Sequence, residues 1–173
     1  YAKTPANKNS SLQIQQRLLE GVKNNNTVPR VALQSTNPEV LSNIKRKNMS
    51  IVNADKMNSK DIEIELIYPL PGTTYDGWVK ELSGMMPIKK LKINVYPCLI
   101  LPNAELNDKS YKKRFKMKTK TIPFNVDMEE CEIITSMESM SYEDVVKGWM
   151  FVWIVKNFWF EPILRYIYYE YFK

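Results

Sequence analysis

The order of apolar and polar residues between positions 28 and 68 predicts a strand, a helix and a second strand. Val28–Gln34 is a short, mostly apolar run, and Ile62–Tyr68 alternates aliphatic residues with glutamates, which is the period of a strand. Between them, Asn37 is suited to cap a helix that has Pro38 at its first position and ends in the basic run Lys45–Lys47. This spacing is typical of a βαβ unit, so we expect two parallel, neighbouring strands with a right-handed crossover.

The same kind of pattern predicts most of the remaining chain. We expect helices at 12–23, 75–82, 145–160 and 162–171, strands at 91–101 and 129–136, a loop at 1–11, and a solvated helix and basic connector at 107–124. Thr74 and Ser141 are candidate helix caps, and Gly84 is placed just beyond the end of its helix. Pro97 marks a bend in the strand at 91–101. Residues 50–60 leave little length for the crossover, which predicts a cramped helix there.

Composition narrows the classes of function. The chain has 173 residues, a formal net charge of +6, two cysteines and no histidine. Without histidine it cannot hold a Ser-His-Asp triad, a Cys-His dyad or a histidine-ligated zinc site. Neither of the glycine-rich phosphate-binding motifs is present. Two distant cysteines and the lack of a signal peptide favour a cytoplasmic protein, and the start without methionine favours a fragment or a processed product.

Several stretches carry a family resemblance in the same order along the chain. They are LQSTNP at 33–38, NIKRKNM at 43–49, LIYPLPGT at 66–73, YPC at 96–98 with LPNA at 101–104, and SMSYED at 139–144. Together they resemble the second half of a radical S-adenosylmethionine barrel, from enzymes that carry a cobalamin-binding domain ahead of it. The resemblance implies an α/β fold, a partial barrel of mainly parallel strands with an aromatic-rich helical extension at the C-terminus. It implies a barrel half at 1–106 and a basic connector with the helical extension at 107–173.

The resemblance also implies a binding site for the nucleoside cofactor. The residues that match are Gln34, Ser35, Arg46, Glu65, Leu70 and Pro71. Gln34 would bind the ribose or the methionine part of the ligand, Arg46 its carboxylate, and Glu65 the ribose hydroxyls, while the backbone around Leu70 and Pro71 would face adenine. Structural alternatives stay open. Gln34 can form hydrogen bonds with the backbone at the strand end, and Arg46 can be a charge at the end of the helix. Glu65 is the strongest candidate, since a buried carboxylate without a partner costs several kcal/mol.

Resembling enzymes need a [4Fe–4S] cluster on a C-x-x-x-C-x-x-C motif, and no such motif is present. Cys98 and Cys131 cannot replace it, because cluster ligands must converge on one small site. The expected cofactor is therefore S-adenosylmethionine, with the cluster and cobalamin supplied by a longer chain or a partner chain. The expected function is the binding half of a methyltransferase or a ring-forming enzyme that acts on a small molecule. We expect this chain alone to be inactive, and no catalytic residue or metal ligand is assigned.

A second class of function comes from the aromatic C-terminus. The helices at 145–160 and 162–171 can pack over the domain, or they can lie in a membrane interface with Trp and Tyr at the headgroups. The alternative function is therefore a non-catalytic binding or membrane-surface module. The basic connector at 107–124, with interleaved aromatics, could grip a phosphate backbone, but a solvated helix explains it better and no nucleic acid is expected.

Overall fold

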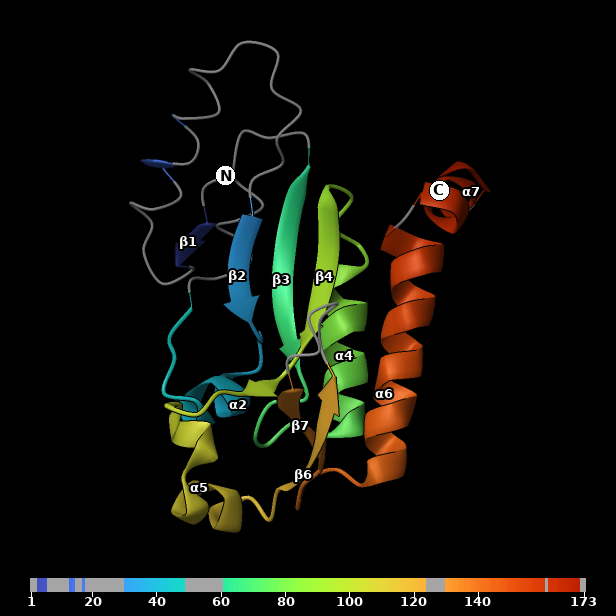
Figure 1. The fold of residues 1–173 in the computed structure, drawn as a ribbon. Helices are drawn as coiled ribbons and strands as arrows, with labels where there is room; N and C mark the ends of the chain where they lie inside the picture. The colour runs from blue at the N-terminus through green and yellow to red at the C-terminus, as the bar shows by residue number, and fades with distance from the viewer. Residues whose placement is uncertain are drawn as a thin grey trace.

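The computed structural model describes residues 3–5, 13, 14, 17, 30–48, 61–123, 130–160 and 162–171. Four parallel strands form one sheet in the order β1-β2-β3-β4 (Figure 1). They are β1 (Lys3–Pro5), β2 (Arg30–Gln34), β3 (Ile62–Tyr68) and β4 (Leu91–Pro97). The prediction that the strands at 28–34 and 62–68 are parallel neighbours is confirmed. The predicted loop at 1–11 is wrong for Lys3–Pro5, which pairs with β2 because extended backbone at that edge completes the hydrogen bonds of β2.

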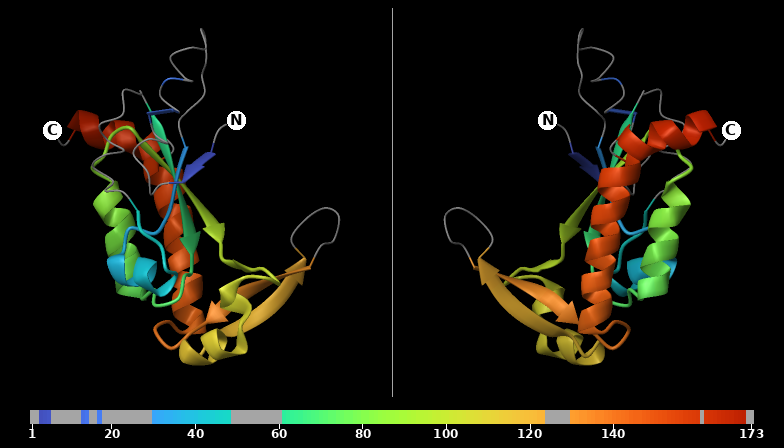
Figure 2. Two further views of the ribbon diagram at one scale, coloured as in Figure 1. Left: turned by 90° about the vertical axis from the view of Figure 1, so that its left-hand side faces the viewer. Right: turned by 90° about the vertical axis from the view of Figure 1, so that its right-hand side faces the viewer.

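Two helices cover one face of this sheet, α4 (Tyr75–Met85) and α6 (Tyr142–Val155), and both lie on the same side of it in Figure 2. The side chains that β3 turns to this side are fully buried: Ile62, Ile64, Leu66 and Tyr68. Tyr68 stacks on Trp78 of α4 with ring centroids 4.6 Å apart, and meets Trp149 of α6 edge-on at 5.4 Å. The alternation of β3 therefore sets which face carries the apolar core.

Asn37 caps α2 (Pro38–Asn43), as predicted, and its side chain accepts hydrogen bonds from the amides of Glu39 and Val40. The helix ends earlier than predicted, before the basic run at 45–47. Lys45 takes a left-handed conformation with φ 52°. Its amide donates to Ser42 and that of Arg46 donates to Leu41 across 2.8 Å, the pattern that closes a helix.

The caps predicted for the later helices are confirmed. Thr74 accepts a hydrogen bond from the amide of Gly77, and Ser141 accepts one from the amide of Asp144. The position predicted for Gly84, beyond the helix, is wrong. Helix α4 continues to Met85, because Met85 buries its side chain in the core and this favours another turn.

A second, antiparallel sheet has the order β5-β7-β6. It consists of β5 (Leu99–Ile100), β6 (Lys118–Pro123) and β7 (Glu130–Ser136). The 3₁₀ turn η1 (Glu105–Asn107) and the short helix α5 (Lys109–Arg114) lie between β5 and β6 in the chain. The bend predicted at Pro97 is confirmed, since β4 ends there and β5 joins the other sheet. The connector predicted at 107–124 is wrong in part, because Lys118–Pro123 form β6. Its Lys-Thr alternation gives this strand one side in solvent.

The chain ends in a π-helical turn, η2 (Lys156–Phe160), and in α7 (Pro162–Tyr171), which begins at the predicted proline. Among the described residues, no helix is long and apolar enough to cross a membrane. The fold is therefore mixed α/β with a parallel sheet, and the described residues do not close a barrel. The predictions for 50–60 and for all but Gln13, Ile14 and Arg17 of the helix at 12–23 lie outside the described residues.

Candidate functional site: the polar face of the parallel sheet

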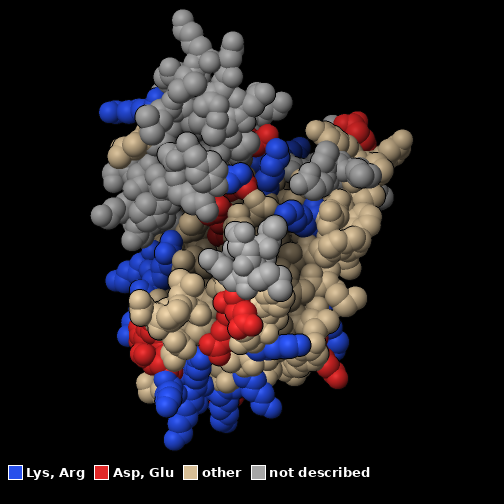
Figure 3. Space-filling view, in the orientation of Figure 1, with Lys and Arg blue, Asp and Glu red and all other residues tan. Residues whose placement is uncertain are grey.

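The sheet face that α4 and α6 leave open carries charged and polar side chains. Because alternate residues of β3 point to opposite faces, Glu63 and Glu65 lie on the face away from the apolar core. In the register of the sheet, Glu65 is flanked by Ala32 of β2 and Asn94 of β4. Both glutamates are buried, with exposed fractions of 8% and 6%. Figure 3 shows acidic and basic side chains gathered over the part of this face where β3 begins.

Glu63 belongs to a polar network that crosses three strands and reaches the C-terminal segment. Arg30 donates from Nε to Glu63 Oε2 across 2.7 Å, and the Asn94 amide donates to the other carboxylate oxygen. Lys156 of η2 donates from Nζ to Asn94 Oδ1 across 3.0 Å, which fixes the orientation of that amide. The negative charge of Glu63 is therefore compensated within the protein.

Glu65 is one step further along β3 toward the carboxyl end of the sheet. Its neighbour in β2 is the small residue Ala32. Ligands of parallel α/β sheets bind at the carboxyl ends of the strands. The position of Glu65 agrees with the binding role that the sequence predicts, and that role stays a prediction.

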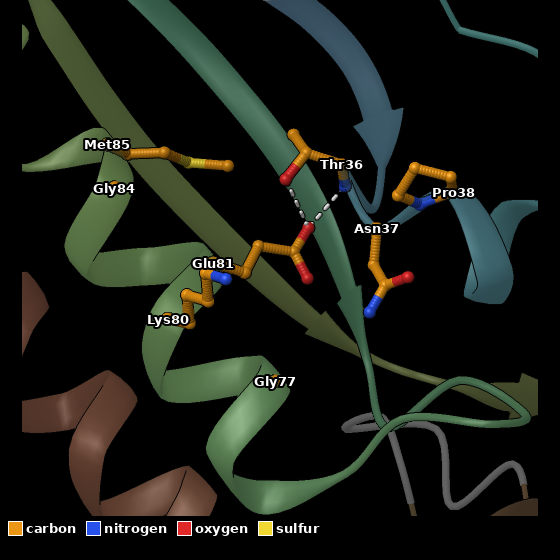
Figure 4. A pocket seen from close by; sticks show the side chains of 8 residues that line it. All are labelled: Thr36, Asn37, Pro38, Gly77, Lys80, Glu81, Gly84 and Met85. Atoms are coloured by element: carbon orange, nitrogen blue, oxygen red, sulfur yellow. Dashed lines mark hydrogen bonds between the residues drawn. The ribbon is translucent and has the colours of Figure 1, made fainter.

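Gln34 and Ser35 follow the end of β2. Gln34 has φ 65°, and the register between β2 and β3 shifts just before it. Ser35 is buried and donates its hydroxyl to Glu81 of α4, at 3.0 Å from Oε1 and 3.1 Å from Oε2. The Thr36 amide and hydroxyl donate to the same carboxylate, as Figure 4 shows. Ser35 is thus turned toward α4, where it holds the strand end in place.

Glu81 lines a cavity of about 390 Å³ between α4 and the segment that joins β2 to α2. Burial raises the pKa of Glu81, and the hydrogen bonds from Thr36 and Ser35 oppose this shift in part. The described hydrogen bonds of this carboxylate are all intramolecular and come from Ser35 and Thr36. We therefore assign Glu81 to the architecture of the strand end.

Arg46 follows α2 in the chain, where the backbone passes beside the end of β2. It donates from Nη2 to the Ala32 carbonyl across 2.8 Å and from Nε to Asn48 Oδ1 across 3.2 Å. Asn48 in turn donates to the carbonyls of Leu33 and Ser35. Burial lowers the pKa of the Arg46 guanidinium. Arg46 therefore supports the end of β2 through Nε and Nη2.

Leu70 and Pro71 lie in a buried turn after β3. The Leu70 amide donates to the Thr73 hydroxyl across 3.2 Å, and the Pro71 carbonyl accepts a hydrogen bond from Asn43 across 3.2 Å. Gly72, at φ 89°, is required here because a side chain at this position would overlap the Asn43 amide. The turn is thereby tied to α2 at the same edge of the sheet as Gln34.

The structure thus brings Gln34, Arg46 and the turn at 70–72 together at the carboxyl edge, with Glu65 further down the same sheet. Sequence reasoning missed Arg30, Asn94 and Lys156. Asn94 is the polar residue in an otherwise apolar strand centre, and this signal could have found it. Lys156 interrupts an aromatic run, but its reach to Asn94 depends on how η2 packs against the edge strand.

The residues described here do not fit an iron–sulfur cluster. Cys98 is buried between the two sheets and burial raises its pKa to about 12, while Cys131 lies on β7. Within the described ranges, no group of three or more His, Cys, Asp or Glu side chains could hold a metal ion. Comparison of the chain with protein-family models and with curated proteins gives no match.

Proposed function

We propose that the polar face of the parallel sheet binds S-adenosylmethionine or a related nucleoside, and that the chain is the cofactor-binding half of a cobalamin-dependent radical S-adenosylmethionine enzyme. The observation that carries the proposal is the position of Glu65. This carboxylate is 6% exposed and lies on the face of the parallel sheet that is opposite α4 and α6. In a barrel of parallel strands that face is the interior, and helices cover the other one. The four-stranded sheet would then be a partial barrel wall.

In this role the described residues bind and orient the ligand. Glu65 accepts hydrogen bonds from the ribose hydroxyls, and Gln34 binds at the mouth of β2. Arg46 uses Nη1 for the methionine carboxylate, since its Nε and Nη2 bind Asn48 and Ala32. The turn at 70–72 lies against the adenine. No step through a cluster or through cobalamin follows from this chain, because the described residues do not fit a cluster and the sequence has no histidine to offer cobalt. Both cofactors, and the missing domains, would come from a longer chain or a partner.

Equilibrium dialysis of radiolabelled S-adenosylmethionine against the 173-residue chain tests the proposal. We expect weak, saturable binding that Glu65→Gln lowers about tenfold, because a hydrogen bond to a charged group contributes roughly 1.5–3 kcal/mol. The matched control is Glu39→Gln, an exposed glutamate on α2. Equal affinity in the two variants, or no binding by the unmodified chain, would contradict the proposal.

A second experiment addresses the cluster. Anaerobic reconstitution of this chain with iron and sulfide should give no stoichiometric cluster, and no 5′-deoxyadenosine above a control with dithionite alone. Stoichiometric cluster on the purified chain, with product above that control, would show that the chemistry has been misplaced.

A further inference from the structure

Helix α6 exposes an apolar stripe on the side that faces away from the sheet. Its members, with the exposed fraction of each residue, are Tyr142 (63%), Val146 (39%), Met150 (60%), Trp153 (61%), Ile154 (47%) and, in η2, Phe158 (41%). They follow one another at the spacing of one helix face, while the opposite face buries Val145, Gly148, Val152 and Val155 against the core. In the right-hand view of Figure 2, no other described element passes over α6. The middle of this edge is free of charge in Figure 3.

The stripe is large enough to be an interface. Side chains of this size expose on the order of 100 Å² each at these fractions, so the stripe presents roughly 600 Å² of apolar surface. That value is at the top of the range for the largest patch on a monomeric protein. The exposed residues Glu143 and Asn157 lie near its two ends, and the exposed Lys147 lies on the same helix face. With them the footprint approaches the about 800 Å² that each partner of a stable complex buries.

The order of residues along the stripe fits a second copy of itself. We propose that α6 of two copies of this chain packs antiparallel about a two-fold axis at Met150. Residues whose numbers add up to about 300 then face each other across the axis. Met150 meets its own counterpart, Val146 meets Ile154, Tyr142 meets Phe158, and Trp153 faces Lys147, whose ammonium group is suited to an aromatic ring. Near the ends of the stripe, the Glu143 carboxylate faces the Asn157 amide, a complementary polar pair, and the antiparallel arrangement opposes the two helix dipoles.

The polar residues around the stripe favour a protein over a lipid surface. A helix that lies in a membrane interface carries mainly Lys and Arg on its polar face. The first turn of α6 instead carries Glu143 and Asp144, which anionic headgroups would repel. The sheet side of α6 is already buried in the protein, so only a narrow stripe is left for contact.

Analytical ultracentrifugation of the 173-residue chain tests this dimer. An interface of this size with aromatic anchors predicts dissociation in the micromolar range or tighter. We expect Met150→Glu, which buries two facing charges at the axis, to weaken the dimer at least a hundredfold. The matched control is Lys113→Glu, an exposed residue on α5, which should leave the dimer intact. The proposal is overturned if the unmodified chain stays monomeric at a concentration 100-fold above the micromolar range. It is also overturned if the two variants dimerise equally.

Cysteine cross-linking in a Cys131→Ser background tests the antiparallel arrangement. Met150→Cys should form a disulfide between two copies. Val146→Cys should not link to itself, because eight residues of helix separate the two sites by about 12 Å, beyond the reach of a disulfide. It should link to an Ile154→Cys chain in a mixture. Self-linking by Val146→Cys at the rate of Met150→Cys would overturn the arrangement. So would a monomeric chain that sediments with phosphatidylcholine–phosphatidylserine vesicles.

Discussion

The hydroxyl of Ser35 donates to Glu81 Oε1 across 3.0 Å and joins the end of β2 to α4 over 46 positions of sequence. The residue just before it, Gln34, is the predicted ligand-binding side chain at the mouth of the strand. Glu81 also accepts from the amide and hydroxyl of Thr36. The Glu81 carboxylate of α4 therefore fixes the backbone next to Gln34. Ser35 contributes by holding that backbone in place.

A positioning role for Ser35 predicts an effect on stability that is separate from ligand binding. Ser35→Ala should lower the free energy of unfolding by about 1–2 kcal/mol, since it removes a buried hydrogen bond to a carboxylate. The affinity for S-adenosylmethionine should change less than threefold, whereas Gln34→Ala should weaken it about tenfold. Urea unfolding and equilibrium dialysis measure the two effects. The control is Ser83→Ala on the exposed side of α4. A larger loss of affinity for Ser35→Ala than for Gln34→Ala would assign Ser35 to the ligand itself.

Glu81 also predicts a pH dependence. Its folded-state pKa is raised, so the folded state holds the proton more tightly than the unfolded chain does. The contribution of this group to stability is therefore full below the ordinary carboxyl pKa and is lost as the pH rises through the raised value. Glu81→Gln keeps an acceptor for the Thr36 amide and does not titrate. Its stability relative to the unmodified chain should rise between pH 4 and the raised pKa, and then stay constant to pH 8. Urea unfolding at several pH values measures this difference, and a difference independent of pH would contradict the assignment.

The elements that sequence predicted correctly are those with a short-range cause. Asn37, Thr74 and Ser141 each cap a helix through an amide two or three residues away, and the alternation in β3 is visible in seven residues. The parts that it missed depend on distant partners. Met85 extends α4 past Gly84 because it reaches the core, and the edge of β7 recruits Lys118–Pro123 as a strand.

The same distinction applies to the site. The burial of Glu65 could be predicted from one strand, because this glutamate stands in an otherwise apolar run. The network around Glu63 could not, since Arg30, Asn94 and Lys156 come from three separate elements. Only the register of the sheet and the packing of η2 bring them together.

Gly148 should be indispensable for the packing of α6 on the sheet. A Cβ at this position would overlap the hydroxyl of Tyr68, which is itself held against the carbonyls of Asp144 and Val145 at 3.3 Å. Gly148→Ala should therefore lower the free energy of unfolding by about 1–3 kcal/mol or more. Adding Tyr68→Phe, which removes the closest of the overlapping atoms, should restore part of the loss. Urea unfolding of the single and double variants measures both effects, and strictly additive losses would exclude the contact as the cause.

Gly84 gives the opposite expectation within α4. A Cβ there meets no atom within 4 Å, and the residue lies inside the helix. Gly84→Ala should raise the free energy of unfolding by about 0.4–1 kcal/mol, because alanine restricts the unfolded chain and favours the helix. Thermal and urea unfolding check the sign. Destabilisation would mean that something occupies the space beside Gly84 in the folded protein.

The two cysteines should differ sharply in reactivity. Cys98 is 4% exposed, its amide donates to the Tyr68 carbonyl across 3.1 Å, and burial raises its pKa to about 12, so almost none of it is thiolate at pH 8. Cys131 is partly exposed on β7.

Iodoacetamide at pH 8 should modify Cys131 within minutes and Cys98 only as fast as the protein unfolds. Mass spectrometry of tryptic peptides measures the two rates. Cys131→Ser should then make the folded chain resistant, and adding urea above the unfolding midpoint should expose Cys98. Rapid labelling of Cys98 in the folded Cys131→Ser chain would show that the junction between the two sheets opens without global unfolding.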